Sequence, residues 1–223
     1  MLKNLDYIIR KFFFLKFGYV IDKRMLGIDR KRDFNHLYDD YIRKSSVELV
    51  SYEIYRKKIL GSCAEAGVYR GYFAEIINFY FPDRKLYLFD TFEGFDLNDV
   101  NYDKEKQFPN SAQDFSDTNI DLVINIMPNK NNIIIKKGTF PESASDVEDS
   151  FCFVSIDLDL YKPIKSALEF FYPRLNKGGY IFVHDFNNKS FKGSNKAVLE
   201  FSEKNNVPYF PLSDIWGTAI LMK

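Results

Sequence analysis

The feature that most constrains the fold is a regular alternation of short apolar segments and helical segments from about residue 60 onward. Short apolar runs bounded by turn residues are typical of buried strands, and apolar residues at helical spacing separate them. Such alternation predicts a mainly parallel sheet with helices on both faces. The predicted strands are residues 62–67, 85–90, 132–136, 151–157 and 180–185, followed by a closing pair at 207–212 and 217–223.

The helical segments complete an α/β fold with seven strands and an antiparallel strand at the end. Thr118 is the candidate N-cap of one of them, and Gly178 and Gly179 are expected to lead into the strand at 180–185. Residues 91–118 are polar and irregular, and a loop of that length is usually functional or mobile. Its part 95–118 is therefore a candidate lid. The predicted helices are residues 46–59, 72–81, 119–127, 162–175 and 194–204.

The first 45 residues differ in character from the rest of the chain. Residues 1–45 are charged and aromatic and predict an N-terminal helical arm, whereas residues 46–223 predict one domain. The apolar stretch 12–20 is too short, and is interrupted by Lys16, to cross a bilayer. We interpret the arm as packing on the domain or on a second subunit, so a homodimer is the predicted assembly. The other interpretation is a basic amphipathic helix in peripheral contact with a membrane surface.

Composition narrows the class of partner and the compartment. The chain has 31 basic and 31 acidic residues, and this balance argues against a nucleic-acid partner bound through phosphate neutralisation. Cys63 and Cys152 both lie in apolar runs, which is typical of reduced thiols in a cytoplasmic protein. The start of the chain lacks the cleavage site of a signal peptide. The abundance of Lys, Asn, Ile and Phe is typical of an AT-rich bacterial genome.

Acidic residues follow several of the predicted strands. Because the carboxyl ends of parallel strands meet at one edge of the sheet, and ligands bind there, these residues predict one site. An ordinary solvated surface does not explain why separate strands end in acids. The residues are Glu65, Asp90, Asp157, Asp159, His184 and Asp185.

The turn after the first predicted strand indicates which ligand binds. Glu65, Gly67 and Gly71 lie in this turn, where glycine lets the backbone approach a ligand closely. The turn is not the dinucleotide fingerprint GxGxxG. A carboxylate at position 65 would repel a pyrophosphate but accept the cationic amine of S-adenosylmethionine. Asp90, after the next strand, is placed to accept hydrogen bonds from ribose hydroxyls. An ordinary tight turn, and a helix cap at Asp90, are the structural alternatives.

Five motifs in this order resemble one known family. The chain contains "AEAGVYRGYFA", "LYLFDTFEGF", "GTFPES", "VSIDLDLYKP" and "FFYPRLNKGGYIFVHDF", and over residues 48–222 it is similar to the macrocin O-methyltransferases. The resemblance implies a class I, S-adenosylmethionine-dependent enzyme with a Rossmann-like sheet of seven strands. Members of this family usually require Mg²⁺ and methylate sugar hydroxyls.

The resemblance also implies roles for individual residues. Asp157 would ligate a metal, and Asp159 would be the general base. In an extended chain these two carboxylates point the same way, and their repulsion favours a shared cation. A helix N-terminus is the alternative explanation for two acids before residues 161–171. The expected cofactor-binding residues are Glu65, Gly67, Tyr69, Gly71, Asp90, Thr91, Phe92 and Asp157, and Phe92 is equally a candidate core residue.

The chain departs from the family where members often carry Asp-Asp after the fifth strand. Here the pair is His184 and Asp185. His184 is a candidate metal ligand, and imidazole suits Mn, Fe or Zn better than Mg. It is also a candidate second base, or a residue that hydrogen-bonds a metal ligand without touching the metal. The predicted divalent-metal site is therefore Asp157, His184 and Asp185, with Mg²⁺ or Mn²⁺ bound.

Taken together, the sequence predicts a metal-assisted O-methyltransferase that acts on a sugar hydroxyl. The acceptor would be a nucleotide sugar, a surface glycan or a glycosylated metabolite. One alternative is an NAD(P)-dependent oxidoreductase, which the absent GxGxxG disfavours; retention of S-adenosylhomocysteine instead of NAD would separate the two. Another alternative is a non-catalytic binding module in glycan assembly, which predicts that Asp159→Asn leaves function intact.

Overall fold

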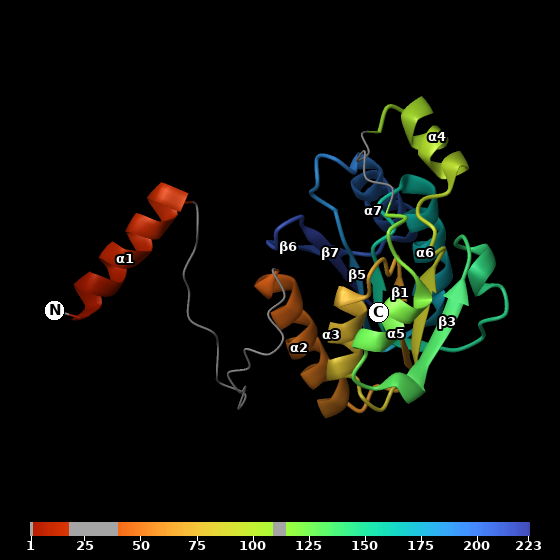
Figure 1. Ribbon diagram of the computed structural model, residues 1–223, viewed down its shortest axis with the longest axis horizontal. Coiled ribbons are helices and arrows are strands. Elements are labelled where there is room, and N and C mark those ends of the chain that lie inside the picture. The colour runs from red at the N-terminus through yellow and green to blue at the C-terminus, as the bar shows by residue number, and fades with distance from the viewer. Residues whose placement is uncertain (1, 18–39, 109–114) are drawn as a thin grey trace. The chain divides into compact units, whose positions relative to one another are not determined.

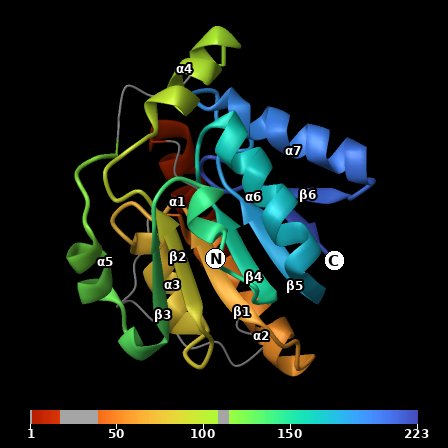
Figure 2. The same cartoon turned by 90° about the vertical axis from the view of Figure 1, so that its right-hand side faces the viewer.

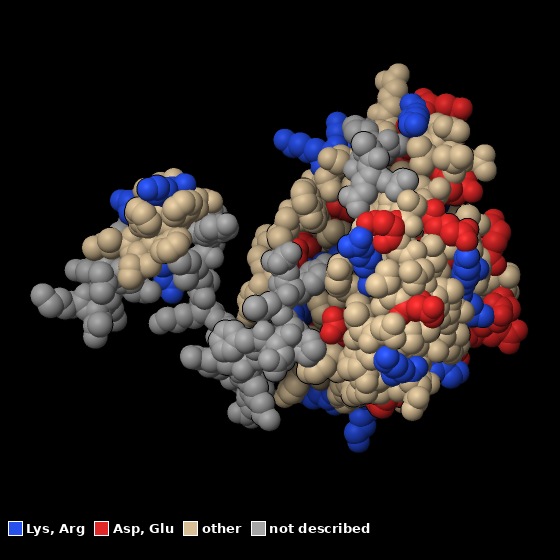
Figure 3. All heavy atoms as spheres, viewed as in Figure 1, with Lys and Arg blue, Asp and Glu red and all other residues tan. Residues whose placement is uncertain are grey.

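The computed structural model describes residues 2–17, 40–108 and 115–223. The chain forms two compact units, Met1–Leu37 and Tyr38–Lys223. The first contains helix α1 (Leu2–Phe17), and the second contains the other described helices and strands (Figure 1). No helix in the described ranges is long and apolar enough to cross a membrane. On the face of the second unit drawn in Figure 3, basic and acidic side chains are interspersed.

The second unit is built on a 7-stranded sheet with the order β3-β2-β1-β4-β5-β7-β6. Strands β1 to β5 run parallel to one another, and β7 runs antiparallel to both β5 and β6. This architecture confirms the predicted fold class. The strands are β1 (Ser62–Ala66), β2 (Leu86–Asp90), β3 (Ile133–Lys137), β4 (Phe151–Ile156), β5 (Leu175–Val183), β6 (Tyr209–Leu212) and β7 (Thr218–Met222).

Helices cover both faces of this sheet (Figure 2). Apolar residues of α2, α3 and α5 pack on one face, and those of α6 and α7 pack on the other. All 6 residues of β4 are buried, because a parallel strand covered on both sides needs a continuous apolar run. The helices are α2 (Tyr41–Arg56), α3 (Tyr72–Tyr80), α4 (Leu97–Glu105), α5 (Ile120–Ile126), α6 (Tyr161–Arg174) and α7 (Lys192–Asn205), with short 3₁₀ turns at Lys130–Asn132 and Glu142–Ala144.

The strand order places the site. From β1 the chain first builds outward through β2 to β3, and β4 then returns to the other side of β1. In open α/β sheets this reversal opens a crevice at the carboxyl ends of the strands. The acids that end β1, β2, β4 and β5 therefore meet there, as the sequence predicts.

The structure corrects the prediction for residues 91–118. Helix α4 lies inside this segment, and its N-cap Asp96 accepts hydrogen bonds from Asn98 N at 2.8 Å and Asp99 N at 3.4 Å. Its sequence, LNDVNYDKE, is too polar to show an apolar stripe, so periodicity missed it. Thr118 is not the cap of the following helix either. Asn119 caps α5 by accepting from Leu122 N at 2.9 Å.

Two other elements begin five residues earlier than predicted. Strand β5 begins at Leu175, so Gly178 and Gly179 lie inside it, where β4 and β5 shift register. A Cβ at Gly179 would lie 2.9 Å from Cys152 O, so the close approach of the two backbones requires glycine. Helix α2 begins at Tyr41 instead of residue 46 and spans the predicted boundary between arm and domain. Its N-cap Asp40 accepts from Arg43 N at 3.0 Å.

Candidate active site

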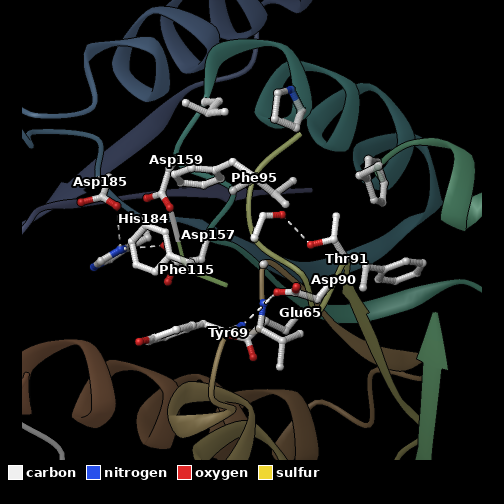
Figure 4. A pocket seen from close by; sticks show the side chains of 18 of the residues that line it. Glu65, Tyr69, Asp90, Thr91, Phe95, Phe115, Asp157, Asp159, His184 and Asp185 are labelled. Carbon is white, nitrogen blue, oxygen red and sulfur yellow. Dashed lines mark hydrogen bonds and ion pairs between the residues drawn. The ribbon is translucent and has the colours of Figure 1, made fainter. Parts of the chain in front are cut away.

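A cavity of about 510 Å³ opens at the carboxyl ends of β1, β2, β4 and β5. Figure 4 shows His184 and Asp185 at one end of it and Asp90 and Thr91 at the other. The structure thus brings most of the sequence-predicted site residues into one place. Those that line the cavity are Glu65, Gly67, Tyr69, Asp90, Thr91, Asp157, Asp159, His184 and Asp185.

Two predicted cofactor-binding residues are not brought to the cavity wall. Gly71 is the N-cap of α3 with φ +82°, and a Cβ there would lie 3.0 Å from the side chain of Val123. Phe92 packs in the core beside α3 and α5, where it is buried. Glycine at the end of the turn and an apolar side chain after β2 are therefore explained by packing.

Gly67 has a structural task at the cavity wall. Its φ is +85°, and an added Cβ would lie 1.9 Å from Asp157 O. The turn after β1 therefore passes directly against the end of β4, where Asp157 N donates to Ala66 O at 2.7 Å. The glycine was predicted to allow close approach of a ligand, and the structure adds close approach of a second backbone.

Asp90 organises the same turn. Its Oδ2 accepts hydrogen bonds from Val68 N at 2.7 Å and Tyr69 N at 2.9 Å, and its Oδ1 accepts from Phe92 N at 2.6 Å. A carboxylate offers about four acceptor positions. These three hydrogen bonds leave room for one more from a ligand hydroxyl in the cavity.

Glu65 is a buried carboxyl group that faces the cavity. Only 1% of the residue is exposed, and among the described residues Oε2 has no hydrogen-bond partner. Burial raises the pKa of Glu65 well above its usual range, although Arg43 opposes this shift. A buried acceptor without a donor costs free energy. The position therefore favours a ligand that brings a positively charged donor.

Asp157, His184 and Asp185 form a tight cluster at the other end of the cavity. His184 Nδ1 lies 2.9 Å from Asp157 Oδ1 and 3.2 Å from Asp185 Oδ2. Burial and Arg43 lower the pKa of His184, but the two carboxylates outweigh them and raise it to about 9. Burial raises the pKa of Asp157, yet His184 and Arg43 hold it well below its usual range.

The three residues of this cluster fit a divalent cation. One ligand atom from each can be chosen so that all lie within 4.8 Å of one another. In an octahedral site with bonds of about 2.1 Å, neighbouring ligand atoms are about 3.0 Å apart. The distances from His184 Nδ1 to the two carboxylates match that spacing. Two carboxylates and an imidazole are also a suitable donor set for Mn²⁺ or Mg²⁺.

Asp159 reaches the cluster by a different route from the one predicted. Strand β4 ends at Ile156, and Asp159 adopts φ +60°, so the chain is not extended between Asp157 and Asp159. The left-handed turn brings Asp159 to Asp185. Burial and the hydrogen bond with Asp185 raise the pKa of Asp159 well above its usual range. Asn188 Nδ2 donates to the other side of Asp185, to Oδ1, at 2.6 Å.

Arg43 is a site residue that the sequence analysis missed. It comes from the first turn of α2 and is 1% exposed. Its Nη1 lies 3.0 Å from Asp157 Oδ2, and its Nη2 lies 3.2 Å from Ser155 Oγ. In the sequence it is one basic residue among many in a segment assigned to the arm, and nothing in its neighbourhood distinguishes it.

The comparison with protein families decides the assignment. The model of the macrocin O-methyltransferase (TylF) family matches residues 19–223. The chain belongs to this family. It is thereby assigned to the S-adenosylmethionine-dependent O-methyltransferases, as the five motifs indicate. No protein of curated function matches the chain in sequence.

Solved structures support the fold of this methyltransferase. The O-methyltransferase NovP is 17% identical to this chain with a TM-score of 0.64, and the match covers 81% of this chain and 79% of the NovP chain. The calicheamicin methyltransferase CalS11 is 23% identical with a TM-score of 0.62, covering 81% and 78%. A putative caffeoyl-CoA O-methyltransferase from Staphylococcus aureus is 14% identical with a TM-score of 0.54, covering 97% and 91%. At these identities the likeness establishes the fold.

Aromatic residues line the cavity of the methyltransferase between its two ends. The ring of Phe115 lies 5.1 Å from the ring of Tyr69 and 5.1 Å from that of Phe95. Tyr69 Oη donates to Asp117 Oδ1 at 2.7 Å, and Thr118 Oγ1 donates to Tyr69 O. The described end of the predicted lid is therefore attached to the turn after β1. A closing motion of the lid stays a prediction.

Proposed function

We propose that the enzyme transfers the methyl group of S-adenosylmethionine to a hydroxyl group of a sugar, with a divalent cation held by Asp157, His184 and Asp185. The observation that supports the cofactor assignment most directly is Glu65. Its buried carboxyl group faces the cavity with one oxygen unpartnered. The ammonium group of the cofactor supplies the missing donor and charge.

The remaining cofactor contacts follow from the cavity. Asp90 receives a ribose hydroxyl at its free acceptor position. Asp90 ends β2, the strand that pairs with β1, which carries Glu65. Tyr69, Phe95 and Phe115 exclude water from the cofactor, since a pocket with aromatic walls desolvates what it encloses. The sulfonium carries its methyl group as a good leaving group, so alignment and deprotonation are the tasks left to the protein.

Asp159 receives the proton of the acceptor hydroxyl. The oxygen–methyl bond forms as the sulfur–methyl bond breaks, S-adenosylhomocysteine leaves, and the proton passes to the Asp159 carboxylate. Asp159 lines the cavity, which exposes its carboxylate to a bound acceptor as a general base requires. A bound divalent cation lowers the pKa of a hydroxyl group that it coordinates. His184 serves as a ligand in this scheme and as a second base only where its ring is not coordinated.

A sugar acceptor is supported by the family and by the cavity wall. Asn188, Ser190 and Trp216 also line the cavity, and Trp216 is exposed. Amide, hydroxyl and indole groups suit a ligand with many hydroxyls and an apolar ring face. Among the solved relatives, an apo structure of CalS11 carries the description TDP-rhamnose 3'-O-methyltransferase. For this chain we propose an acceptor of the same chemical class: a nucleotide sugar, a surface glycan or a glycosylated metabolite.

The arm provides a surface for a further partner. In α1, Phe12, Phe14 and Leu15 are exposed, and Lys16 lies among them. Exposed apolar side chains of this kind bury themselves against a protein or a lipid surface. We propose a second copy of the chain as that partner, with peripheral membrane contact as the alternative. Cys63 and Cys152 are buried and free, in agreement with a cytoplasmic location.

Calorimetric titration with S-adenosylhomocysteine tests the cofactor assignment. We expect S-adenosylhomocysteine to bind the wild type with a micromolar dissociation constant, and we expect no binding of NAD. Glu65→Gln keeps the shape of the side chain but removes its charge, and a hydrogen bond to a charged group is worth about 1.5–3 kcal/mol. The dissociation constant should therefore rise about 10- to 100-fold. Glu203→Gln, on the exposed side of α7, is the matched control. Absence of binding to the wild type would overturn the assignment.

A further inference from the structure

We infer that Arg43 is a positioning residue of the divalent-metal site and that helix α2 is thereby part of the catalytic machinery. The inference rests on the metal site of the proposed function. It starts from one asymmetry in Asp157. The two oxygens of its carboxylate have different partners: Oδ2 faces the Arg43 guanidinium at 3.0 Å, and Oδ1 faces His184 Nδ1 at 2.9 Å.

The guanidinium of Arg43 is held rigidly. Its carbon Cζ lies 3.7 Å from the centroid of the Phe73 ring, so the planar group stacks on an aromatic face. Its Nη2 donates to Ser155 Oγ, and Ser155 is 0% exposed. The backbone of Arg43 is fixed as well, because Asp40 Oδ1 accepts from its N–H. Asp40 Oδ2 accepts from Ile215 N at 2.9 Å, which ties the start of α2 to the loop before β7.

This rigidity fixes the direction of the Asp157 carboxylate. With Oδ2 held by the guanidinium, Oδ1 faces His184, where the metal ligands converge. Hydrogen-bond partners behind a metal ligand orient it, and their loss typically costs 10–100-fold in metal affinity. Arginine presents its donors in a planar fork that bridges Asp157 and Ser155 at once. Lysine has a single point charge and cannot reproduce that geometry.

The sign of the effect separates positioning from simple electrostatics. A guanidinium beside the site repels a divalent cation, so an Arg43 that acted only through its charge would weaken metal binding. Replacing it by a neutral side chain would then strengthen binding. An Arg43 that orients Asp157 has the opposite effect, because the ligand oxygen loses its fixed direction. The same substitution therefore gives opposite results under the two explanations.

The test is calorimetric titration of the full chain with Mn²⁺ alone and, separately, with S-adenosylhomocysteine. The variants are Arg43→Lys and Arg43→Met, and the matched control is Arg56→Lys on the exposed side of the same helix. We expect the Mn²⁺ dissociation constant to rise 10- to 100-fold in both Arg43 variants. It should stay at the wild-type value in the control. S-adenosylhomocysteine affinity and the melting temperature should stay close to wild type in Arg43→Lys.

Each other outcome overturns the inference. Unchanged or tighter Mn²⁺ binding in Arg43→Lys and Arg43→Met shows that Arg43 does not orient a ligand. Parallel loss of Mn²⁺ binding, S-adenosylhomocysteine binding and thermal stability in Arg43→Lys shows a general structural role. A wild type that binds S-adenosylhomocysteine but no Mn²⁺ removes both the metal site and the role of Arg43, and leaves methyl transfer standing. The cofactor titration thus distinguishes failure of this inference from failure of the proposed function.

Discussion

At the scale of single residues, the chemistry of this site depends on backbone conformation as much as on side-chain type. Asp159 and Asp185 both adopt positive φ, +60° and +58°, which is uncommon for residues other than glycine. Such conformations persist only where the surroundings hold them, and they are concentrated at functional sites. Here they bring two carboxyl groups from different strand ends into contact, and burial together with this contact raises the pKa of Asp159.

The role of Asp159 as the base gives a prediction. Asp159→Asn keeps the size of the side chain, but the amide cannot take up the proton of the sugar hydroxyl. The kcat should therefore fall about 10²- to 10⁴-fold. S-adenosylhomocysteine affinity should be unchanged, because the cofactor's amine is assigned to Glu65 at another part of the cavity. Steady-state kinetics with calorimetry on the same preparation measure both quantities. A kcat retained in Asp159→Asn would show that Asp159 is not the base, whereas a wild type that binds the cofactor without turnover would favour the alternative of a non-catalytic binding module.

At the scale of elements, helix α4 is attached to the domain by a buried acid. Asp103 is 1% exposed, and its Oδ2 accepts from Tyr161 N, in the first turn of α6, at 3.3 Å. Its Oδ1 has no hydrogen-bond partner among the described residues. Tyr102 stacks on Tyr161, with ring centroids 5.9 Å apart. Burial raises the pKa of Asp103 to about 6, although the Tyr161 N–H opposes this shift.

The raised pKa predicts how stability depends on pH. An unfolded Asp titrates near pH 4. Between about pH 4 and 6 the unfolded chain releases the Asp103 proton while the folded chain retains it, so the contribution of Asp103 to stability falls as the pH rises. Asp103→Asn removes that loss. The variant should be more stable than the wild type at pH 7.5, by up to about 3 kcal/mol, and the difference should shrink toward pH 4.

Urea unfolding at the two pH values measures this difference. Glu105→Gln on the same helix is the control, because Glu105 is exposed. A difference between Asp103→Asn and the wild type that does not change with pH would contradict the explanation. The stability difference would then not come from the titration of Asp103.

At the scale of the whole molecule, the chain separates into two compact units at residues 37 and 38. The boundary predicted from the sequence, at residue 45, lies inside helix α2. Truncation of the chain at these two positions removes different residues. A cut at 37 retains Asp40 and Arg43, whereas a cut at 45 removes the N-cap of α2 and the buried partner of Asp157.

Two truncated chains test this boundary. The chain 38–223 should keep the stability and S-adenosylhomocysteine affinity of the full-length protein. The chain 46–223 should lose about 3–5 kcal/mol, because removing one partner of a buried ion pair leaves the other uncompensated. Urea unfolding and calorimetry measure the two properties. Equal stability of both truncated chains would place the boundary at residue 45 instead.

The amino-acid sequence determined the order and type of most elements, because strong apolar periodicity specifies strands and helices locally. It failed at α4, whose polar sequence carries no apolar stripe, and at the start of α2, where a buried arginine interrupts the pattern. The acids after β1, β2, β4 and β5 were also predictable, since parallel strands end at one edge. The family motifs added the methyltransferase assignment and the candidate roles of those acids.

Only the tertiary structure decided which of these side chains meet. Arg43 and Asp157 are 114 residues apart, and no local pattern connects them. Gly67 and Gly71 look equivalent in the sequence, but one lies against Asp157 at the cavity and the other packs on α5. The physical reason is that periodicity encodes which face of an element is buried, whereas pairing and ionisation depend on what lies across the fold. The sequence therefore predicts the edge of the sheet that carries the site, and packing selects the residues that act together there.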